Sequence, residues 1–313
     1  MRAVQCVPGG VAVVEVDEPG GDGELVHVSA VSICASDFQY IAWGSQQIIG
    51  HEIAGVLDDG TPVAVEGMFG CGACEWCERG NYNLCALTAT AALGITAPGG
   101  MSEFFRAPAR ALRPLPMGLA PEDACLVEPG SVAWHACRTG GVGPDTRVVV
   151  VGAGAIGLLA VAAAQALGAA EVAVEARHPH QREAAERFGA VQPRGLYDVV
   201  IESAGSESSL HRSFELVRPA GTVVTIGVFT PDVAWPHLTS FLKEAKTAPS
   251  LGYCADGGHG EVREFDRVAA MLVQRPEIAA TLITHRFGID DAVHAFDVAG
   301  KRENGVFRVV VHP

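Results

Sequence analysis

Residues 148–157 read VVVVGAGAIG, and this stretch decides how the second half of the chain folds. Four β-branched valines in a row predict a strand buried on both faces, as in a parallel sheet. Gly152, Gly154 and Gly157 follow at the spacing G-x-G-x-x-G, and residues 158–168 form an apolar run that suits a helix and ends in glycine. A strand, a glycine turn and a helix in this order predict a βαβ unit of a doubly wound parallel sheet.

The same turn predicts a site for a dinucleotide. Free backbone N–H groups and the helix dipole favour an anion at a helix N-terminus, and glycines let a pyrophosphate approach the backbone closely. The residues expected at the pyrophosphate are Gly152, Gly154, Ala155, Ile156 and Gly157. A glycine-rich turn in an ordinary βαβ unit is the alternative, and the all-valine strand before the motif favours the dinucleotide site.

Four cysteines lie in one short run upstream of this sheet. Two residues separate Cys71 from Cys74 and Cys74 from Cys77, and Cys85 follows eight positions after Cys77. A loop with this spacing can place four thiolates around a tetrahedral Zn²⁺ with no open position, which makes a structural site. The alternatives are two disulfides or four free thiols. Short C-x-x-C steps suit a tetrahedral ion better, and nothing near the N-terminus reads as a secretory signal, so we expect a reduced, cytoplasmic protein.

Three residues on either side of this loop have the side chains of a second metal site. Cys34, His51 and Glu128 offer one thiolate, one imidazole and one carboxylate, a set that leaves a zinc ion with room for water or substrate. Each has an ordinary explanation by itself: a buried small hydrophobe, a hydrogen-bonded histidine, and a loop glutamate before proline. Their order around the four-cysteine loop favours a catalytic zinc.

Composition narrows the class of protein. The 313 residues are 49% hydrophobic and 19% charged, which fits a globular chain long enough for two domains. A net charge of −14 argues against binding to nucleic acid or to an anionic membrane. Residues 148–170 carry no charge over 23 positions, but the glycines within them fit a buried strand and its covering helix better than a membrane span.

Taken together, these segments are similar to those of the zinc-containing medium-chain dehydrogenases, and within them to the polyol (sorbitol-type) branch. The resemblance extends from end to end of the chain and includes residues 198–205 and 282–287. It rests on Cys34-x-Ser36-Asp37, on Gly50-His51-Glu52, on the four-cysteine loop with Gly80 and Asn83, on Glu128-Pro129 with residues 135–138, and on the glycine turn.

The resemblance implies an α/β fold in two parts, a GroES-like, mainly β catalytic domain and a Rossmann cofactor domain with a doubly wound parallel sheet. We expect the catalytic zinc domain over residues 1–130, the Rossmann domain over 131–250, and a return to the catalytic domain over 251–313. Alternating runs at 25–28 and 62–65 predict strands of the first part. The resemblance also implies a homodimer or homotetramer.

The second half alternates between strand and helix signals. Residues 189–197 are fewer than most relatives have between these elements, so we expect one strand–helix unit to be abbreviated, and we expect the sheet to end near Lys246. The predicted strands are 171–175, 198–202 and 222–227, and the predicted helices are 182–188, 210–217 and, in the returning segment, 265–272.

The activity implied by the resemblance is hydride transfer between an alcohol and a nicotinamide, with zinc as the Lewis acid that promotes loss of the hydroxyl proton. Cys34 and His51 are then zinc ligands, and the hydroxyl of Ser36 relays the proton. The third protein ligand stays open. We favour Glu128, directly or through water, with Glu52 able to exchange with it.

The cofactor is predicted from residues 171–182, where the second strand of the cofactor domain ends. The place at which NAD enzymes of this family have a carboxylate for the ribose falls on Ala176, which leaves room for a 2′-phosphate. Arg177, together with His178 or Arg182, can bind that phosphate, so NADP(H) is expected. The alternative is that Glu175 binds NAD. Five more residues are expected at the cofactor: Ser203, Ala204, Gly227, Val228 and Phe229.

Three functions follow as alternatives. The leading one is a zinc-dependent oxidoreductase that uses NADP(H) on a small alcohol or polyol, or on the matching aldehyde or ketone. The second is an NAD-dependent sugar or amino-alcohol dehydrogenase of the same family, and the third is a catalytically silent dinucleotide-binding sensor. Gln39 stands where relatives often have a histidine that passes the proton onward, so here the proton leaves through water, the cofactor ribose or another group.

Overall fold

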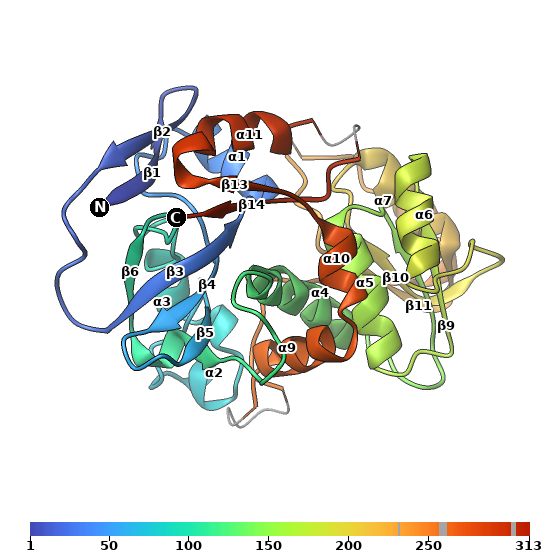
Figure 1. Cartoon of the computed structure of the whole chain (residues 1–313). Helices are drawn as coiled ribbons and strands as arrows, with labels where there is room; N and C mark the ends of the chain where they lie inside the picture. Colours follow the sequence, from blue (N-terminus) through green and yellow to red (C-terminus); the bar gives the residue numbers. More distant parts are fainter. Residues whose placement is uncertain (231, 257–261, 302–304) are drawn as a thin grey trace. The chain divides into compact units, whose positions relative to one another are not determined.

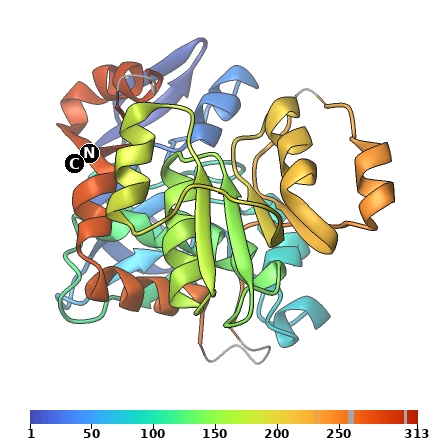
Figure 2. The same ribbon diagram turned by 90° about the vertical axis from the view of Figure 1, so that its right-hand side faces the viewer.

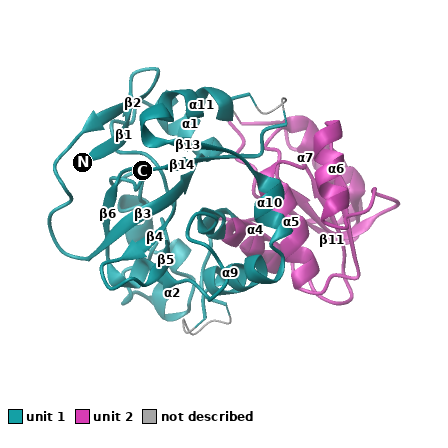
Figure 3. Cartoon of the chain, in the orientation of Figure 1, with its two compact units in different colours: residues 1–129, 253–313 teal, residues 130–252 magenta. Residues whose placement is uncertain are grey.

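The computed structural model describes residues 1–230, 232–256, 262–301 and 305–313. These residues form two compact units, coloured separately in Figure 3. Unit 1 comprises residues 1–129 and 253–313, and unit 2 comprises residues 130–252. Each unit has a hydrophobic core of its own.

Unit 1 is built on a seven-stranded mixed sheet, which Figure 1 shows. Its strands are β3 (Glu24–Ser32), β4 (Glu52–Leu57), β5 (Pro62–Val65), β6 (Phe104–Ala107), β7 (Leu112–Pro114), β13 (Ile283–Gly288) and β14 (Arg308–His312). The order is β13-β14-β3-β4-β5-β7, and β6 pairs with β3. Only β13 and β14 are parallel among these pairs of described strands. The strands predicted at 25–28 and 62–65 are confirmed as β3 and β5.

Besides four 3₁₀ helices, the remaining described elements of unit 1 are a hairpin and short α-helices. They are β1 (Arg2–Val7), β2 (Gly10–Glu15), α1 (Ala35–Ala42), α2 (Glu75–Glu78), α3 (Ala86–Thr90), α9 (Glu264–Gln274), α10 (Glu277–Leu282) and α11 (Ala292–Ala299). Helix α11 shows why the sequence folds this way. Its buried residues Ala292, Ala295, Phe296 and Ala299 recur at the spacing of one helical face, and that face packs into the core of the unit.

Unit 2 contains a five-stranded, all-parallel sheet (Figure 2). Its strands are β8 (Arg147–Val151), β9 (Glu171–Glu175), β10 (Tyr197–Glu202), β11 (Val217–Thr225) and β12 (Lys246–Pro249), in the order β12-β11-β10-β8-β9. The helices are α5 (Ala155–Ala166), α6 (Pro179–Arg187), α7 (Glu207–Leu216) and α8 (His237–Lys243), while α4 (Val127–Thr139) contains the point where unit 1 ends. The predicted Rossmann-like sheet is confirmed.

The structure differs from the predicted elements at their ends. The strand expected at 222–227 begins five residues earlier, at Val217, so the helix expected at 210–217 ends at Leu216 as α7. The sheet ends near Lys246 as expected, because its last described strand, β12, spans Lys246–Pro249 and pairs with β11. After α6 a single parallel bridge joins Ala173 of β9 to Val191, and the abbreviated strand–helix unit stays a prediction.

The glycine turn joins β8 to α5. Gly152 has a φ of 105°, in the left-handed region, and a Cβ at Gly157 would collide with the carbonyl oxygen of Gly152. The uncharged stretch at 148–170 therefore forms the strand, this tight turn and a buried helix. Within the described residues, no helix has both the length and the apolar character needed to cross a membrane.

Candidate active site

Two chain segments of unit 1 meet where strands β3 and β4 lie side by side. Ser32, the last residue of β3, is paired with Glu52, the first residue of β4. Cys34 follows β3 by two positions and His51 directly precedes β4, so antiparallel pairing brings them together. One ligand atom from each of Cys34, His51 and Glu52 lies within 4.8 Å of the others. A thiolate, an imidazole and a carboxylate at this spacing suit zinc.

His51 is oriented by two residues of α1. Its Nδ1 lies 3.3 Å from Oδ1 of the fully buried Asp37, and its Nε2 lies 3.4 Å from the hydroxyl of Ser36. Burial lowers the pKa of His51, but the carboxylate of Asp37 and the thiol of Cys34 raise it well above its usual value. A carboxylate on one ring nitrogen leaves the other for a metal or a proton, which is the usual arrangement around metal-bound histidines. Ser36 is thus near the nitrogen that faces the site.

Glu52 is fixed by an arginine from the other end of the chain. The Nη1 atom of Arg308, in β14, lies 2.7 and 2.8 Å from the two carboxylate oxygens of Glu52, and the hydroxyl of Ser32 also donates to Glu52. Arg308 and Glu52 are 4% and 0% exposed, so this is a buried ion pair. It holds Glu52 in place at the edge of the candidate metal centre.

Glu128 lies in the first turn of α4 and is buried near the same centre. Burial raises the pKa of its carboxyl group to about 8, His51 acts in the opposite direction, and the charge of Glu52 raises it further. Glu128 does not belong to the compact group that Cys34, His51 and Glu52 form. The third ligand therefore stays a prediction, with Glu52 inside the group and Glu128 beside it.

The four-cysteine loop forms a separate cluster in unit 1. The sulfur of Cys77 lies 3.6 Å from that of Cys74 and 4.0 Å from that of Cys71, close to the roughly 3.8 Å edge of a tetrahedron with Zn–S bonds of about 2.3 Å. The sulfur of Cys85 joins this group, within 4.8 Å of the others. The backbone N–H of Cys71 donates a hydrogen bond to the sulfur of Cys85. This hydrogen bond is the main reason why the pKa of Cys85 falls to about 6. All nine cysteines are free thiols, so the donor set fits zinc better than disulfides.

The glycine turn of unit 2 is supported by residues at the end of β10. The hydroxyl of Ser203 donates to the carbonyl oxygens of Val151 and Gly152, at 3.2 and 3.0 Å. The fully buried carboxylate of Glu202 accepts the backbone N–H groups of Ala204 and Gly205, at 2.9 and 2.8 Å. The predicted cofactor residues Ser203 and Ala204 are therefore held beside the turn.

The strand end predicted to read the cofactor lies between β9 and α6. Nη1 of Arg182 donates to the carbonyl oxygens of Ala176 and Arg177, both at 3.3 Å, while the backbone N–H groups of Arg177 and His178 share the side-chain oxygen of Gln181. Arg182 thus shapes the loop as well as adding charge. At the end of β11, beyond Gly227, Val228 is exposed and Phe229 packs against the core of unit 2.

The sequence assigns no role to three of these residues, Asp37, Arg308 and Glu202. Asp37 stands in the motif Cys34-x-Ser36-Asp37, and Glu202 lies in residues 198–205, but residue type and spacing do not indicate what either side chain contacts. Arg308 carried a usable signal, because it is the one charged residue within the otherwise apolar run 306–311, and a charge in such a place needs a buried partner.

Comparison with known proteins agrees with this geometry. Residues 20–117 match the family model of the alcohol dehydrogenase GroES-like domain, and residues 155–271 match that of the zinc-binding dehydrogenases. The chain is 30% identical to L-galactonate-5-dehydrogenase of Escherichia coli strain K12, over 92% of both proteins. It is 28% identical to sorbitol dehydrogenase of Bos taurus, over 91% of this chain and 88% of that one. Alcohol dehydrogenase TADH from Thermus sp. ATN1 is 26% identical, with a TM-score of 0.86 over both whole chains.

The chain therefore belongs to the zinc-dependent alcohol and polyol dehydrogenase family. Membership makes it an oxidoreductase, and it implies zinc and a nicotinamide cofactor.

Proposed function

We propose that this protein is an NADP(H)-dependent zinc dehydrogenase that interconverts an alcohol or polyol with the matching aldehyde or ketone. The observation that carries the proposal is the grouping of Cys34, His51 and Glu52 within 4.8 Å, with the hydroxyl of Ser36 3.4 Å from Nε2 of His51. A metal site that only stabilises a fold is closed by four protein ligands. A set of three ligands beside a hydroxyl that can transfer a proton instead indicates catalysis. Unit 1 is then the catalytic domain, and unit 2 is the dinucleotide-binding domain.

Each residue of the centre has a distinct part in this proposal. Cys34 and His51 hold the catalytic zinc, and Glu128 or Glu52 completes the ligand set. When bound, zinc polarises the reacting oxygen, and the nicotinamide exchanges the hydride with the carbon. The hydroxyl of Ser36 relays the proton: it accepts the proton of the substrate hydroxyl while it passes its own to water, the cofactor ribose or another group. The four cysteines Cys71, Cys74, Cys77 and Cys85 hold a second, structural zinc.

The preference for NADP(H) is supported by the side chains around Ala176. This small residue follows β9 directly, and Arg177 comes next, so a 2′-phosphate would meet a cation and no carboxylate from these two positions. His178 and Arg182 add further positive charge on the same loop.

A panel of substrates tests the activity. Polyols, primary alcohols and secondary alcohols are incubated with NADP⁺, and aldehydes and ketones with NADPH, for the parent and for His51→Ala. We expect at least one alcohol and its carbonyl partner to be turned over by the parent alone. Absence of turnover across the panel, with the zinc content shown to be complete, would contradict the proposal and favour the silent sensor.

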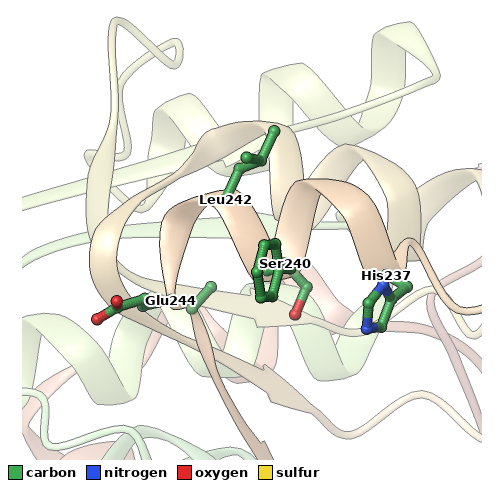
Figure 4. A pocket seen from close by; sticks show the side chains of 6 residues that line it. His237, Ser240, Leu242 and Glu244 are labelled. Atoms are coloured by element: carbon green, nitrogen blue, oxygen red, sulfur yellow. The ribbon is translucent and has the colours of Figure 1, made fainter.

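We also propose a cytoplasmic homodimer or homotetramer, assembled through the outer face of unit 2. Helix α8 stands at the outer edge of this unit (Figure 2), and Leu238, Phe241 and Leu242 are 69%, 67% and 72% exposed on it. Next to it β12 is the last described strand of the sheet, with one edge available for pairing. A hollow of about 490 Å³, shown in Figure 4, is lined by His237, Ser240, Phe241, Leu242, Glu244 and Ala245.

The molar mass in solution tests the assembly. Light scattering should give two or four chains for the parent and one or two for Phe241→Asp/Leu242→Asp, because buried carboxylates would oppose contact. Met117→Asp is the matched control, since Met117 is 96% exposed in unit 1. A monomeric parent would contradict this part of the proposal.

A further inference from the structure

Arg212 and Glu175 form an ion pair at the carboxyl end of the parallel sheet in unit 2. Nε of Arg212, on α7, lies 2.8 Å from Oε2 and 3.1 Å from Oε1 of Glu175, the last residue of β9. Nη1 of the same guanidinium donates to Oε2 of Glu215, at 2.9 Å, along α7. Arg212 is thus held between two carboxylates, of which Glu175 alone ends a strand.

Glu175 directly precedes Ala176, the position expected to face the ribose, and is the only acid at this strand end. Its backbone carbonyl accepts the N–H of Gly152, the first glycine of the turn, at 3.2 Å, and it is paired with Val151 of β8. In NAD-binding units a carboxylate about 20 residues after the motif accepts a hydrogen bond from the ribose 2′-hydroxyl. An unpaired Glu175 would give this strand end such an acceptor, and it would repel a 2′-phosphate.

We propose that Arg212 determines the cofactor preference by occupying Glu175. Its guanidinium engages the carboxylate, which removes an acceptor for the 2′-hydroxyl and cancels a charge that opposes the 2′-phosphate. The inference rests on the NADP(H) preference proposed above, in which Arg177 contacts the phosphate. Arg212 acts through Glu175, so it is a positioning residue and not a contact of the phosphate.

Loss of the Arg212–Glu175 ion pair is expected to change the affinity for a 2′-phosphate more than it changes the stability of the fold. Arg212 and Glu175 are 41% and 38% exposed, and an ion pair so open to solvent adds little to stability. A phosphate ester carries close to two negative charges at neutral pH. Uncovering one carboxylate at the strand end proposed to meet the phosphate, in a partly solvated site, should change affinity on the order of 10-fold.

The test compares two probes, 2′,5′-ADP and 5′-AMP, which differ only in the 2′-phosphate. Dissociation constants are measured by calorimetry for the holoprotein, and the quantity followed is the ratio of the constant for 5′-AMP to that for 2′,5′-ADP. Arg212→Gln should lower this ratio about 10-fold, because 2′,5′-ADP binds more weakly while 5′-AMP binds as well as before or better. Arg212→Lys keeps the charge and should keep most of the ratio.

A double variant separates the role of Glu175 from that of Arg212. In Arg212→Gln/Glu175→Gln no carboxylate is uncovered, so the ratio should return to within about 3-fold of the parent. Glu215→Gln is the matched control, because it removes the other carboxylate that Arg212 contacts and should leave the ratio unchanged.

The outcomes distinguish this inference from the NADP(H) preference itself. A parent that binds both probes equally would refute the preference, whereas a fall of the ratio in Arg212→Gln would still support the role of Arg212. An unchanged ratio in Arg212→Gln would overturn the inference. So would a double variant as impaired as the single one, or a loss of both probes together with a lower melting temperature, since these would mean direct contact with the phosphate or a purely structural role.

Discussion

Arg308 and Glu52 are 256 positions apart in the chain, yet the guanidinium Nη1 atom of Arg308 contacts both carboxylate oxygens of Glu52 inside unit 1. The pair ties the last described strand, β14, to the first residue of β4. It also fixes the carboxylate that forms a compact group with Cys34 and His51, within 4.8 Å. The C-terminal segment of the chain therefore completes the candidate metal centre.

Removal of Arg308 should destabilise unit 1. Arg308→Met leaves the charge of Glu52 buried without its partner, which costs on the order of 3–5 kcal/mol in free energy of unfolding. Arg2→Met is the control, because Arg2 pairs with Glu103 while 40% exposed, and loss of a pair so open to solvent should cost far less than loss of the buried one. Urea denaturation of the three proteins measures both values. Equal losses for the two variants would show that burial does not matter at this pair.

The proton relay predicts a change in rate without a change in cofactor binding. Ser36→Ala should lower kcat about 10²–10⁴-fold, the usual range for a positioned group that transfers a proton. The affinity for the dinucleotide should barely change, because Ser36 lies in unit 1 beside His51 and not at the glycine turn. Steady-state kinetics together with direct cofactor titration provide the two readings. An unaltered kcat would assign the transfer to water.

The cofactor preference is tested at the strand end. Arg177→Ala should weaken NADP⁺ about 10- to 150-fold in kcat/KM and leave NAD⁺ nearly unchanged, because one charge-assisted contact contributes about 1.5–3 kcal/mol. Ala176→Asp should reverse the preference, since a carboxylate there repels the phosphate and accepts from the 2′-hydroxyl. If the parent used both cofactors equally, or if Arg177→Ala kept the preference, another group would have to read the ribose.

The raised pKa of Glu66 predicts how the stability of the fold depends on pH. Burial raises the pKa of its carboxyl group from 4.5 to about 7, and the charge of Arg263 offsets this only in part. Between these two values the unfolded chain has lost the proton and the folded chain keeps it, so the free energy of unfolding should fall as the pH rises through this window. Glu66→Gln cannot titrate and should show a shallower decline. Parallel pH profiles for the two proteins would contradict the assignment.

The features that could be predicted from the sequence are those encoded by the spacing of neighbouring residues. Contacts between distant residues could not be predicted. The glycine turn and the four-cysteine loop are each encoded within some fifteen residues, so their geometry follows from the spacing itself. Glu52 forms an ion pair with Arg308, and Glu175 forms one with Arg212. Nothing in the sequence near either glutamate reveals which arginine is its partner.

Strand β12 was missed for a different reason. Its sequence, KTAP, ends in proline and is largely exposed, so it has neither the β-branched run nor the alternation that predicts a strand. It is a strand because β11 offers an edge to pair with. Residue type alone also left the third zinc ligand open, because both candidates, Glu52 and Glu128, are glutamates. The structure keeps both as candidates, because both are buried near His51.

The central claim is that zinc held by Cys34 and His51 serves an alcohol dehydrogenase, apart from a second zinc in the four-cysteine loop. The most direct measurement is the number of zinc ions per chain, taken together with alcohol-dependent reduction of NADP⁺, for the parent, His51→Ala and Cys74→Ser. We expect two zinc ions and turnover in the parent. His51→Ala should keep one zinc and its fold but lose turnover, whereas Cys74→Ser should lose the structural zinc and unfold more easily. One zinc or none in the parent, or full turnover by His51→Ala, would contradict the account.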